Sequence, residues 1–419
     1  MLQAATKKVN LLLIYQCVLA IGAVLVFFTN VDQFSFMAGM SPAPTYVILA
    51  FCVAAIPILL FSLGKLIYFS HLVILWAVCF LTLSMFSFAL SPFSELAREE
   101  INRRVLAIIF ILLMLILFSG SHLVQLWARR AVFITVIINI INIVLELFNP
   151  LLFAVIDFSD RPPDAVRYAD RPAGLYIDPN KAAFALTLGM VFCTTLLPQK
   201  YRVPFVLLIG LAIFLTFSRG AVLCWLILLV IFSLTGVISK QKILYWIIGL
   251  VVLALVLSFS GGFDLSQLRH SGLLTDDMMG RLEWFQDPFA KEGSADSRKE
   301  VAALAFRMFL EHPILGNGIG STRALSVGIS THNMYLYYMA DHGILGALLV
   351  PGLIFTTVWN VCGNRKFFGI SFLILVSSWC LFSHTVLEDR FILTSFALMA
   401  AMTATSQQEQ QMYLVKQRS

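Results

Sequence analysis

Long apolar stretches alternate with short polar segments along most of the chain. Each stretch runs for roughly 16–25 residues without a charge, which is the length a helix needs to cross about 30 Å of hydrocarbon. The pattern predicts an all-α fold, a polytopic transmembrane bundle of about twelve spans. The predicted spans are 10–29, 44–62, 70–90, 104–120, 131–154, 181–198, 203–217, 220–238, 243–260, 344–361, 367–385 and 390–406. The seventh span is short and is separated from the eighth only by Ser218, Arg219 and Gly220, so a re-entrant arrangement there is an open alternative.

The polar residues gather in two longer segments, 155–180 and 261–343. The chain therefore divides into residues 1–260 with nine spans, a large loop at 261–343 that ends at the start of a further helix, three spans in 344–406, and a tail at 407–419. Within the loop, residues 296–312 have the apolar spacing of an amphipathic helix. Ser297 followed by Glu300 fits a capping box, so this helix is expected to begin at Ser297.

Charge predicts which ends of the spans face the cytoplasm. Of the 419 residues, 59% are hydrophobic and 12% charged, against about 25% charged in soluble domains, so a soluble fold is excluded. If the N-terminus is cytoplasmic, the short loops on that side carry thirteen basic residues and one acid, Glu409. This excess satisfies the positive-inside rule and places both long polar segments on the outer side. The net charge of +6 thus arises from the excess of basic residues on the cytoplasmic side, and it gives no reason to expect a nucleic-acid partner.

Several common chemistries have no support in the sequence. The chain contains no GxxxxGK[ST] loop for nucleotide phosphates, no HExxH zinc motif and no CxxC pair. Its seven cysteines all fall in or beside predicted spans, so no disulfide framework is expected. Asp276 and Asp277 form the only adjacent pair of aspartates and could bind a divalent metal, but no third ligand is evident and a solvated loop is the preferred interpretation.

Three arginines on the predicted outer side, Arg171, Arg219 and Arg298, are candidate phosphate ligands. A guanidinium is always charged and binds phosphate oxygens in a bidentate manner, so three together would suit a diphosphate. Arg298 also lies in the first turn of the predicted loop helix, where backbone N–H groups favour an anion. The alternative is that each arginine anchors a span end at the headgroups or pairs with a nearby acid. Arg219 has no acid near it in the sequence, which makes it the strongest of the three candidates.

His332 is the candidate general base. It opens the stretch THNMYLYYMADHG, where Thr331 could cap the following helix and leave the imidazole near a helix N-terminus. That position favours a neutral imidazole, which can accept a proton. The alternative is a histidine with only a capping role. Tyr335 and its neighbouring aromatics could pack on sugar rings, although interfacial aromatics commonly serve only as a membrane belt.

Four motifs in order resemble the O-antigen ligase and polymerase superfamily. HNMYLYYMADHG resembles the signature H-N-x-x-L-x-x-x-x-E-x-G, with Asp341 where Glu is usual. HPILGNGIG at 312–320 resembles the HP-x-x-G-x-G turn of the family, and RPAG…DPN at 171–180 and SRG at 218–220 also match. The likeness covers about 250 residues in the order the family has them, whereas the first 150 match only as generic spans.

The resemblance implies a bacterial inner-membrane enzyme with its active site facing the periplasm. It implies a metal-independent, inverting glycosyl transfer without a cofactor, from a glycan on undecaprenyl diphosphate to a hydroxyl of the lipid A-core oligosaccharide. His332 would be the base, and Arg219, Arg298 and less surely Arg171 would hold the diphosphate. The matched supporting residues are Asn333, Asp341, Asn180 and Tyr335.

Two other functions remain as alternatives. In the polymerase branch of the same superfamily, the acceptor is another lipid-linked glycan, and the donor chemistry is shared. A transporter of lipid-linked glycans would also suit many spans, but transporters bury charges near the membrane midplane. Here the spans are nearly free of charge apart from Glu146, so the ligase is preferred.

Overall fold

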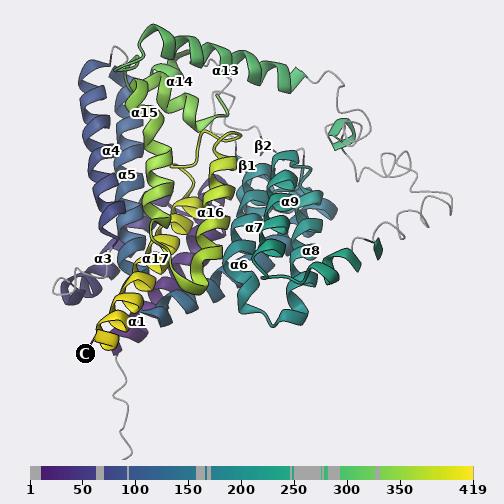
Figure 1. The fold of residues 1–419 in the computed structure, drawn as a ribbon. Coiled ribbons are helices and arrows are strands. Elements are labelled where there is room, and N and C mark those ends of the chain that lie inside the picture. The colour runs from purple at the N-terminus through teal and green to yellow at the C-terminus, as the bar shows by residue number, and fades with distance from the viewer. Residues whose placement is uncertain are drawn as a thin grey trace, which may run out of the picture.

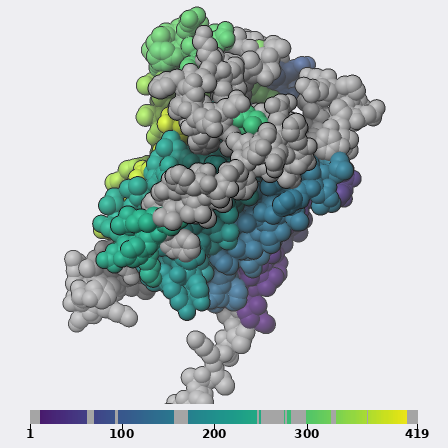
Figure 2. All heavy atoms as spheres, turned by 90° about the vertical axis from the view of Figure 1, so that its right-hand side faces the viewer, coloured from purple at the N-terminus to yellow at the C-terminus, as the bar shows by residue number. Residues whose placement is uncertain are grey.

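The structure is a computed structural model. It describes residues 11–62, 70–91, 94–156, 166–167, 171–245, 248–249, 275, 278–281, 293–325 and 331–418. The helices pack side by side in a bundle, and α13 lies across one end (Figure 1). Figure 2 shows α6–α9, in blue-green and teal, on one face of this bundle, with α13 in green at the end above them.

The chain enters and leaves the bundle at the end opposite α13 (Figure 1). The first part contributes α1 (Leu11–Ala23), the π-helical turn η1 (Val24–Phe28), α2 (Val31–Met37), α3 (Pro44–Ser62), α4 (His71–Leu90), α5 (Ser94–Phe118) and α6 (His122–Phe148). The middle contributes η3 (Pro150–Phe153), β1 (Val155–Ile156), β2 (Val166–Arg167), η4 (Gly174–Tyr176), α7 (Pro179–Cys193), η5 (Thr194–Leu196), α8 (Gln199–Leu215) and α9 (Arg219–Leu234). The last part contributes α13 (Gly293–Glu311), α14 (Ser321–Leu325), α15 (Met334–Val358), η6 (Gly363–Arg365), α16 (Lys366–Trp379) and α17 (Arg390–Arg418).

The predicted helical membrane fold is confirmed. Six described segments are long and apolar enough to cross a membrane: Leu11–Phe28, Pro44–Phe61, His71–Leu90, Glu95–Phe118, His122–Phe148 and Met334–Val358. The predicted spans 181–198, 203–217, 220–238, 367–385 and 390–406 also contain helices, although these helices are shorter or less apolar. Span 243–260 lies largely outside the described residues, and a total of about twelve spans stays a prediction. Within the described residues, the strands are limited to the antiparallel pair β1–β2 inside the predicted loop 155–180.

Most buried apolar side chains belong to one cluster that runs through the bundle and includes much of α7 and α17. Almost every side chain of α7 from Ala182 to Cys193 is buried. In α17 the buried stretch includes the small residues Ala397, Ala400 and Ala401, which allow neighbouring helices to approach closely. Side chains such as Leu49 on α3 and Leu75 on α4 are exposed on the outside of the bundle. An apolar exterior of this kind is what lipid contact requires.

Helix α15 begins at Met334, whereas the sequence predicted a span from residue 344. The helix is broken at Gly343, where φ is +65° and ψ is −148°. The turn 313–320 forms hydrogen bonds with the backbone on both sides of the break. The Ile344 N–H donates to the Pro313 carbonyl at 2.8 Å, and the Asn317 N–H donates to the Ala340 carbonyl at 3.0 Å. Backbone groups freed by the break are thus satisfied within the protein, as a membrane-embedded chain requires.

Two further helix boundaries differ from the prediction. Helix α16 ends at Trp379 instead of continuing to residue 385, so residues 380–389 form an irregular connection before α17. The Cys380 carbonyl accepts a hydrogen bond from the Met334 N–H at 2.8 Å, which joins this connection to the start of α15. The loop helix α13 begins at Gly293, before the expected Ser297. Both changes affect segments that carry candidate site residues.

Candidate functional site

The start of α15 fixes His332 beside the connection 380–389. Asn333 is the N-cap of α15, because its side-chain oxygen accepts hydrogen bonds from the N–H groups of Tyr335 at 3.0 Å and Leu336 at 3.1 Å. The prediction that Thr331 caps this helix is therefore wrong. The Tyr335 hydroxyl donates to the Ser377 carbonyl at 3.1 Å and ties the first turn of α15 to α16.

A second histidine lies against His332. The ring centroids of His332 and His384 are 5.6 Å apart and the rings are nearly perpendicular. Burial, followed by the nearby positive groups His332 and Lys181, lowers the pKa of His384 to about 4. His384 is therefore neutral near pH 7, and its buried Nδ1 has no hydrogen-bond partner among the described residues.

Arg219 also lies close to the connection 380–389, because its neighbour Gly220 packs against Phe382. It is the first residue of α9, directly after the N-cap Ser218, and its side chain is half-buried. A Cβ placed on Gly220 would lie 3.7 Å from the Phe382 ring. The start of α9 and the start of α15 therefore both pack against residues 382–384, one through Gly220 and the other through His332.

Arg171 and Asn180 hold the turn that leads into Arg219. The buried Arg171 donates from Nη1 to the carbonyl oxygens of Phe217 at 3.2 Å and Thr216 at 3.4 Å. The Ser218 hydroxyl donates to Asn180 Oδ1 at 2.9 Å. Asn180 itself is in the first turn of α7, which Asp178 caps. The structure thus brings Arg171, Asn180 and Arg219 together around the turn 216–218.

Arg298 lies in the N-terminal part of α13, whereas that helix packs on α15 through Ala305 and Met308 farther along. The side chain of Arg298 is outside the described residues, as are Asp276 and Asp277. In the part of the chain that the structure describes, no group of three or more metal-ligating side chains occurs.

Asp341 is buried inside the bundle and holds the turn before α14. Its carboxylate accepts hydrogen bonds from the Gly320 N–H at 3.2 Å, the Ser321 hydroxyl at 2.8 Å, and the N–H and hydroxyl of Thr322. Arg104 Nη2 lies 3.7 Å from the same carboxylate. These contacts give Asp341 a supporting position, because they join α15, α14 and α5.

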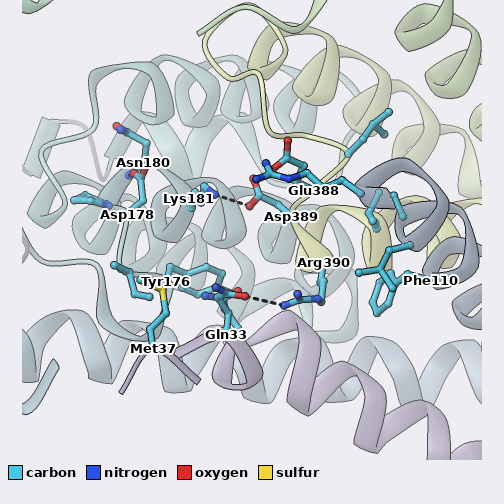
Figure 3. Close-up of a pocket in the computed structure, with 18 of the residues that line it drawn as sticks. Gln33, Met37, Phe110, Tyr176, Asp178, Asn180, Lys181, Glu388, Asp389 and Arg390 are labelled. Atoms are coloured by element: carbon cyan, nitrogen blue, oxygen red, sulfur yellow. Dashed lines mark hydrogen bonds and ion pairs between the residues drawn. The ribbon is translucent and has the colours of Figure 1, made fainter. Parts of the chain in front are cut away.

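A basic cavity of about 580 Å³ lies beside Arg171, Asn180 and the connection 380–389 (Figure 3). Its lining includes five basic residues (Arg103, Arg171, Lys181, Arg281 and Arg390) and three acids (Asp178, Glu388 and Asp389). Lys181 Nζ lies 2.6 Å from Asp389 Oδ1, and Arg103 Nη1 lies 3.1 Å from Glu388 Oε2. Glu388 and Asp389 line the cavity and belong to the same connection, 380–389, as His384, so the cavity and the histidine pair lie along one segment.

Comparison with known proteins identifies the central part of the chain. Residues 204–351 match the family model described as O-antigen ligase. This match supports the predicted resemblance of the region to the O-antigen ligase superfamily, and it does not separate the ligase branch from the polymerase branch. A search of the curated proteins found no match. The O-antigen ligase region supports glycosyl transfer of the ligase or polymerase type, with a lipid-linked glycan donor and a glycan acceptor.

The O-antigen ligase region contains Arg219, Arg298, His332 and Asp341, but much of the cavity lies outside it. Five residues that line the cavity were not predicted from the sequence: Arg103, Lys181, Glu388, Asp389 and Arg390. A signal was present, because three ionisable residues in a row between two apolar spans are unusual in a membrane protein. Burial raises the pKa of Glu388, and the Arg103 guanidinium opposes this shift.

Proposed function

We propose that this protein is an O-antigen ligase of the bacterial inner membrane. It transfers a glycan from undecaprenyl diphosphate to a hydroxyl of the lipid A-core oligosaccharide on the periplasmic side, without a metal or a cofactor. The observation that carries this proposal is the packing of both His332 and the start of α9 against residues 382–384, beside a cavity with five basic residues.

In the proposed reaction, the imidazole of His332 takes the proton of the acceptor hydroxyl. The acceptor oxygen attacks the anomeric carbon of the donor sugar and forms the new glycosidic bond. The bond from that carbon to the diphosphate oxygen breaks, and its electron pair leaves with the lipid diphosphate. Attack opposite the leaving group inverts the anomeric configuration. A positioned base of this kind contributes roughly 10²–10⁴-fold to a rate.

Arg219 and Arg298 bind the diphosphate in this proposal. Negative charge develops on the leaving group as the glycosidic bond breaks, and arginines held in place can stabilise it without a metal. Arg171 contributes by holding the turn 216–218 and by lining the cavity. The mixture of basic and acidic side chains there suits a ligand with both phosphate and sugar hydroxyl groups.

The proposal is tested by reconstitution in liposomes. Purified protein receives a glycan on undecaprenyl diphosphate together with two competing acceptors, lipid A-core and a second lipid-linked glycan, in buffer that contains EDTA. We expect the glycan to appear on lipid A-core. Product formed only on the lipid-linked acceptor would establish a polymerase instead.

Deletion of the gene gives an independent test in cells. Loss of all O-antigen from an intact lipid A-core is expected for a ligase. A single repeat unit attached to the core would contradict the proposal, because that result is produced when only polymerisation fails. Transfer that disappears in EDTA and returns with Mg²⁺ would contradict the metal-independent mechanism.

A further inference from the structure

A second cavity lies at the other end of the bundle. Its volume is about 300 Å³, and its lining comes from α6, η5, the segment η6–α16 and α17. The two cavities lie near opposite ends of α7. Lys181, in the first turn of α7, lines the cavity described above. Arg129 lines the second cavity and donates a hydrogen bond to the carbonyl of Phe192 in the last turn of α7. The second cavity is therefore separate from the proposed catalytic region.

The lining of this cavity is basic. Arg129 and Arg365 both contribute to it, and the described residues that line it include neither aspartate nor glutamate. Arg129 is held in a defined orientation, because Nε donates to the Phe192 carbonyl at 2.8 Å and Nη2 donates to the Thr195 hydroxyl at 2.7 Å. Arg365 Nη1 donates to the Met402 carbonyl at 2.7 Å. Two fixed guanidinium groups in one cavity suit a phosphate group.

The remaining lining is apolar and aromatic. Phe368 lies under the Arg129 guanidinium, with 4.8 Å from the carbon of that group to the ring centroid, and Met402 is buried behind it. On the outside of α6, Leu123 and Trp127 are exposed within one turn of lining residues. A free phosphate ion would gain nothing from the exposed Leu123 and Trp127, whereas the acyl chains of a lipid would cover them.

Gln125 adds a further polar feature. Its side-chain nitrogen donates to the Ala401 carbonyl at 3.0 Å and to the Thr405 hydroxyl at 2.7 Å. Its side-chain oxygen is buried and has no hydrogen-bond partner among the described residues. A buried acceptor without a donor is costly, so a ligand that supplies a hydroxyl group would be favoured next to the arginines.

We propose that this cavity binds the phosphodiester headgroup of an anionic phospholipid, with the acyl chains along the exposed apolar surface of α6. The distribution of basic residues predicts that this end of the bundle faces the cytoplasm, where basic pockets between membrane helices commonly bind anionic headgroups. A bound lipid would connect α6, α16 and α17. This site does not depend on the proposed glycosyl transfer.

Native mass spectrometry of the full-length protein in detergent tests the proposal. Phosphatidylglycerol, phosphatidylcholine and inorganic phosphate are titrated separately. We expect phosphatidylglycerol to bind the wild type at least about 10-fold more tightly than it binds the double variant Arg129→Gln, Arg365→Gln, because two charge-assisted contacts are lost. The matched control is Arg130→Gln. Arg130 lies next to Arg129 but stacks on Trp127 and does not line the cavity, so its variant should bind within about twofold of the wild type.

Three outcomes would overturn the proposal. Equal binding of phosphatidylglycerol by the double variant and the wild type would show that the arginines do not hold the headgroup. Equal binding of phosphatidylcholine would remove the requirement for an anion. Binding of inorganic phosphate as tight as that of the lipid would indicate an ion site instead.

Because the double variant loses internal hydrogen bonds and could unfold, a photoactivatable phosphatidylglycerol is also cross-linked to the wild type. The cross-links should map to residues 122–129 or 365–368, and cross-links only elsewhere would contradict the proposal.

Discussion

The backbone around His332 is held by hydrogen bonds of the two residues that follow it. The cap comes from Asn333, and the Met334 N–H donates to the Cys380 carbonyl at 2.8 Å. The backbone of His332 has a φ of +46°, in the left-handed region that histidine adopts more often than most residues. Replacement of the ring should therefore leave the start of α15 in place, so loss of activity can be separated from loss of structure.

The first prediction concerns this ring. His332→Ala should reduce glycan transfer by about 10²–10⁴-fold, because the proton of the acceptor hydroxyl loses its base. The variant should still insert and unfold at nearly the wild-type temperature. The measurement is product formation in liposomes together with thermal unfolding in detergent. His71→Ala changes an exposed histidine at the start of α4 and serves as the control. Wild-type transfer by His332→Ala would remove this residue from the mechanism.

The second prediction separates binding from anchoring at Arg219. Arg219→Lys keeps the positive charge but loses the planar, bidentate donor, so kcat/KM for the lipid-linked donor should fall about 10–100-fold. Arg130→Lys, at an exposed arginine near the other end of the bundle, should have little effect. If Arg219→Lys kept full activity, a simple anchoring role at the membrane surface would explain the residue.

The third prediction concerns pH and His384. Burial first, and then the neighbouring His332 and Lys181, lower the pKa of His384 from 6.5 to about 4. Between these values the unfolded chain binds the proton and the folded protein does not, so the free energy of unfolding falls as the pH drops from 6.5 toward 4. His384→Gln should weaken this dependence. Thermal unfolding of both proteins between pH 4.5 and 7.5 provides the measurement, and parallel curves would contradict the assignment.

At the scale of elements, the break in α15 determines where the start of this helix lies. The break joins α15 to the turn 313–320, and Asp341 just before it joins α15 to the start of α14. The half-helix 334–342 is thus held at both of its ends, by the Cys380 carbonyl at one end and by this turn at the other. A change at the break should therefore be transmitted to His332.

The fourth prediction tests the break. A Cβ on Gly343 would lie 2.4 Å from the Ile314 carbonyl oxygen, and the combination of φ +65° with ψ −148° is essentially confined to glycine. Gly343→Ala should therefore lower the free energy of unfolding by about 2 kcal/mol or more. Gly352→Ala, in the same helix, would place its Cβ at an ordinary 3.4 Å from the Trp76 ring and should change stability by less than about 1 kcal/mol. Thermal or denaturant unfolding in detergent distinguishes the two. Equal effects would show that the break is not required.

The sequence predicted most helices because lipid imposes long apolar runs, which need no knowledge of packing. It failed where short polar segments depend on distant partners. The sequence placed Asp341 in the helix expected after Thr331, but it gave no sign that residues 320–322 and Arg104 would hold its carboxylate. Likewise Arg219 and His332 were identified from their types and motifs, but their common neighbour at 382–384 could not be predicted, because that contact joins segments far apart in the chain.

At the scale of the whole molecule, the contacts agree with the predicted sidedness of the loops. Segments predicted to be outer meet one another, as in the ion pairs of Arg390 with Asp32 and of Arg323 with Glu99. At the predicted cytoplasmic side, Arg202, just before the predicted span 203–217, donates to the carbonyl of Val237 at the end of the predicted span 220–238. The two ends of the bundle therefore carry different sets of charges.

The fifth prediction assigns these ends to compartments. Glu99→Cys places a thiol at an exposed position near Arg323 and should react with a membrane-impermeant maleimide in cells whose outer membrane has been permeabilised. Lys200→Cys, exposed at the opposite end, should react only after the inner membrane is lysed. Labelling is measured against the wild type, which carries seven cysteines of its own. The reverse pattern would invert the predicted orientation and place the proposed active site in the cytoplasm.

The connection between α16 and α17 has a consequence for the tolerance of this protein to insertions. Three consecutive residues, Glu388, Asp389 and Arg390, attach to three separate segments through Arg103 on α5, Lys181 on α7 and Asp32 on α2. One added residue here would shift the register and break several of these attachments at once. The number of residues between Cys380 and Arg390 is therefore expected to stay constant even where the residue types change, and an epitope tag is better placed in the tail beyond residue 407.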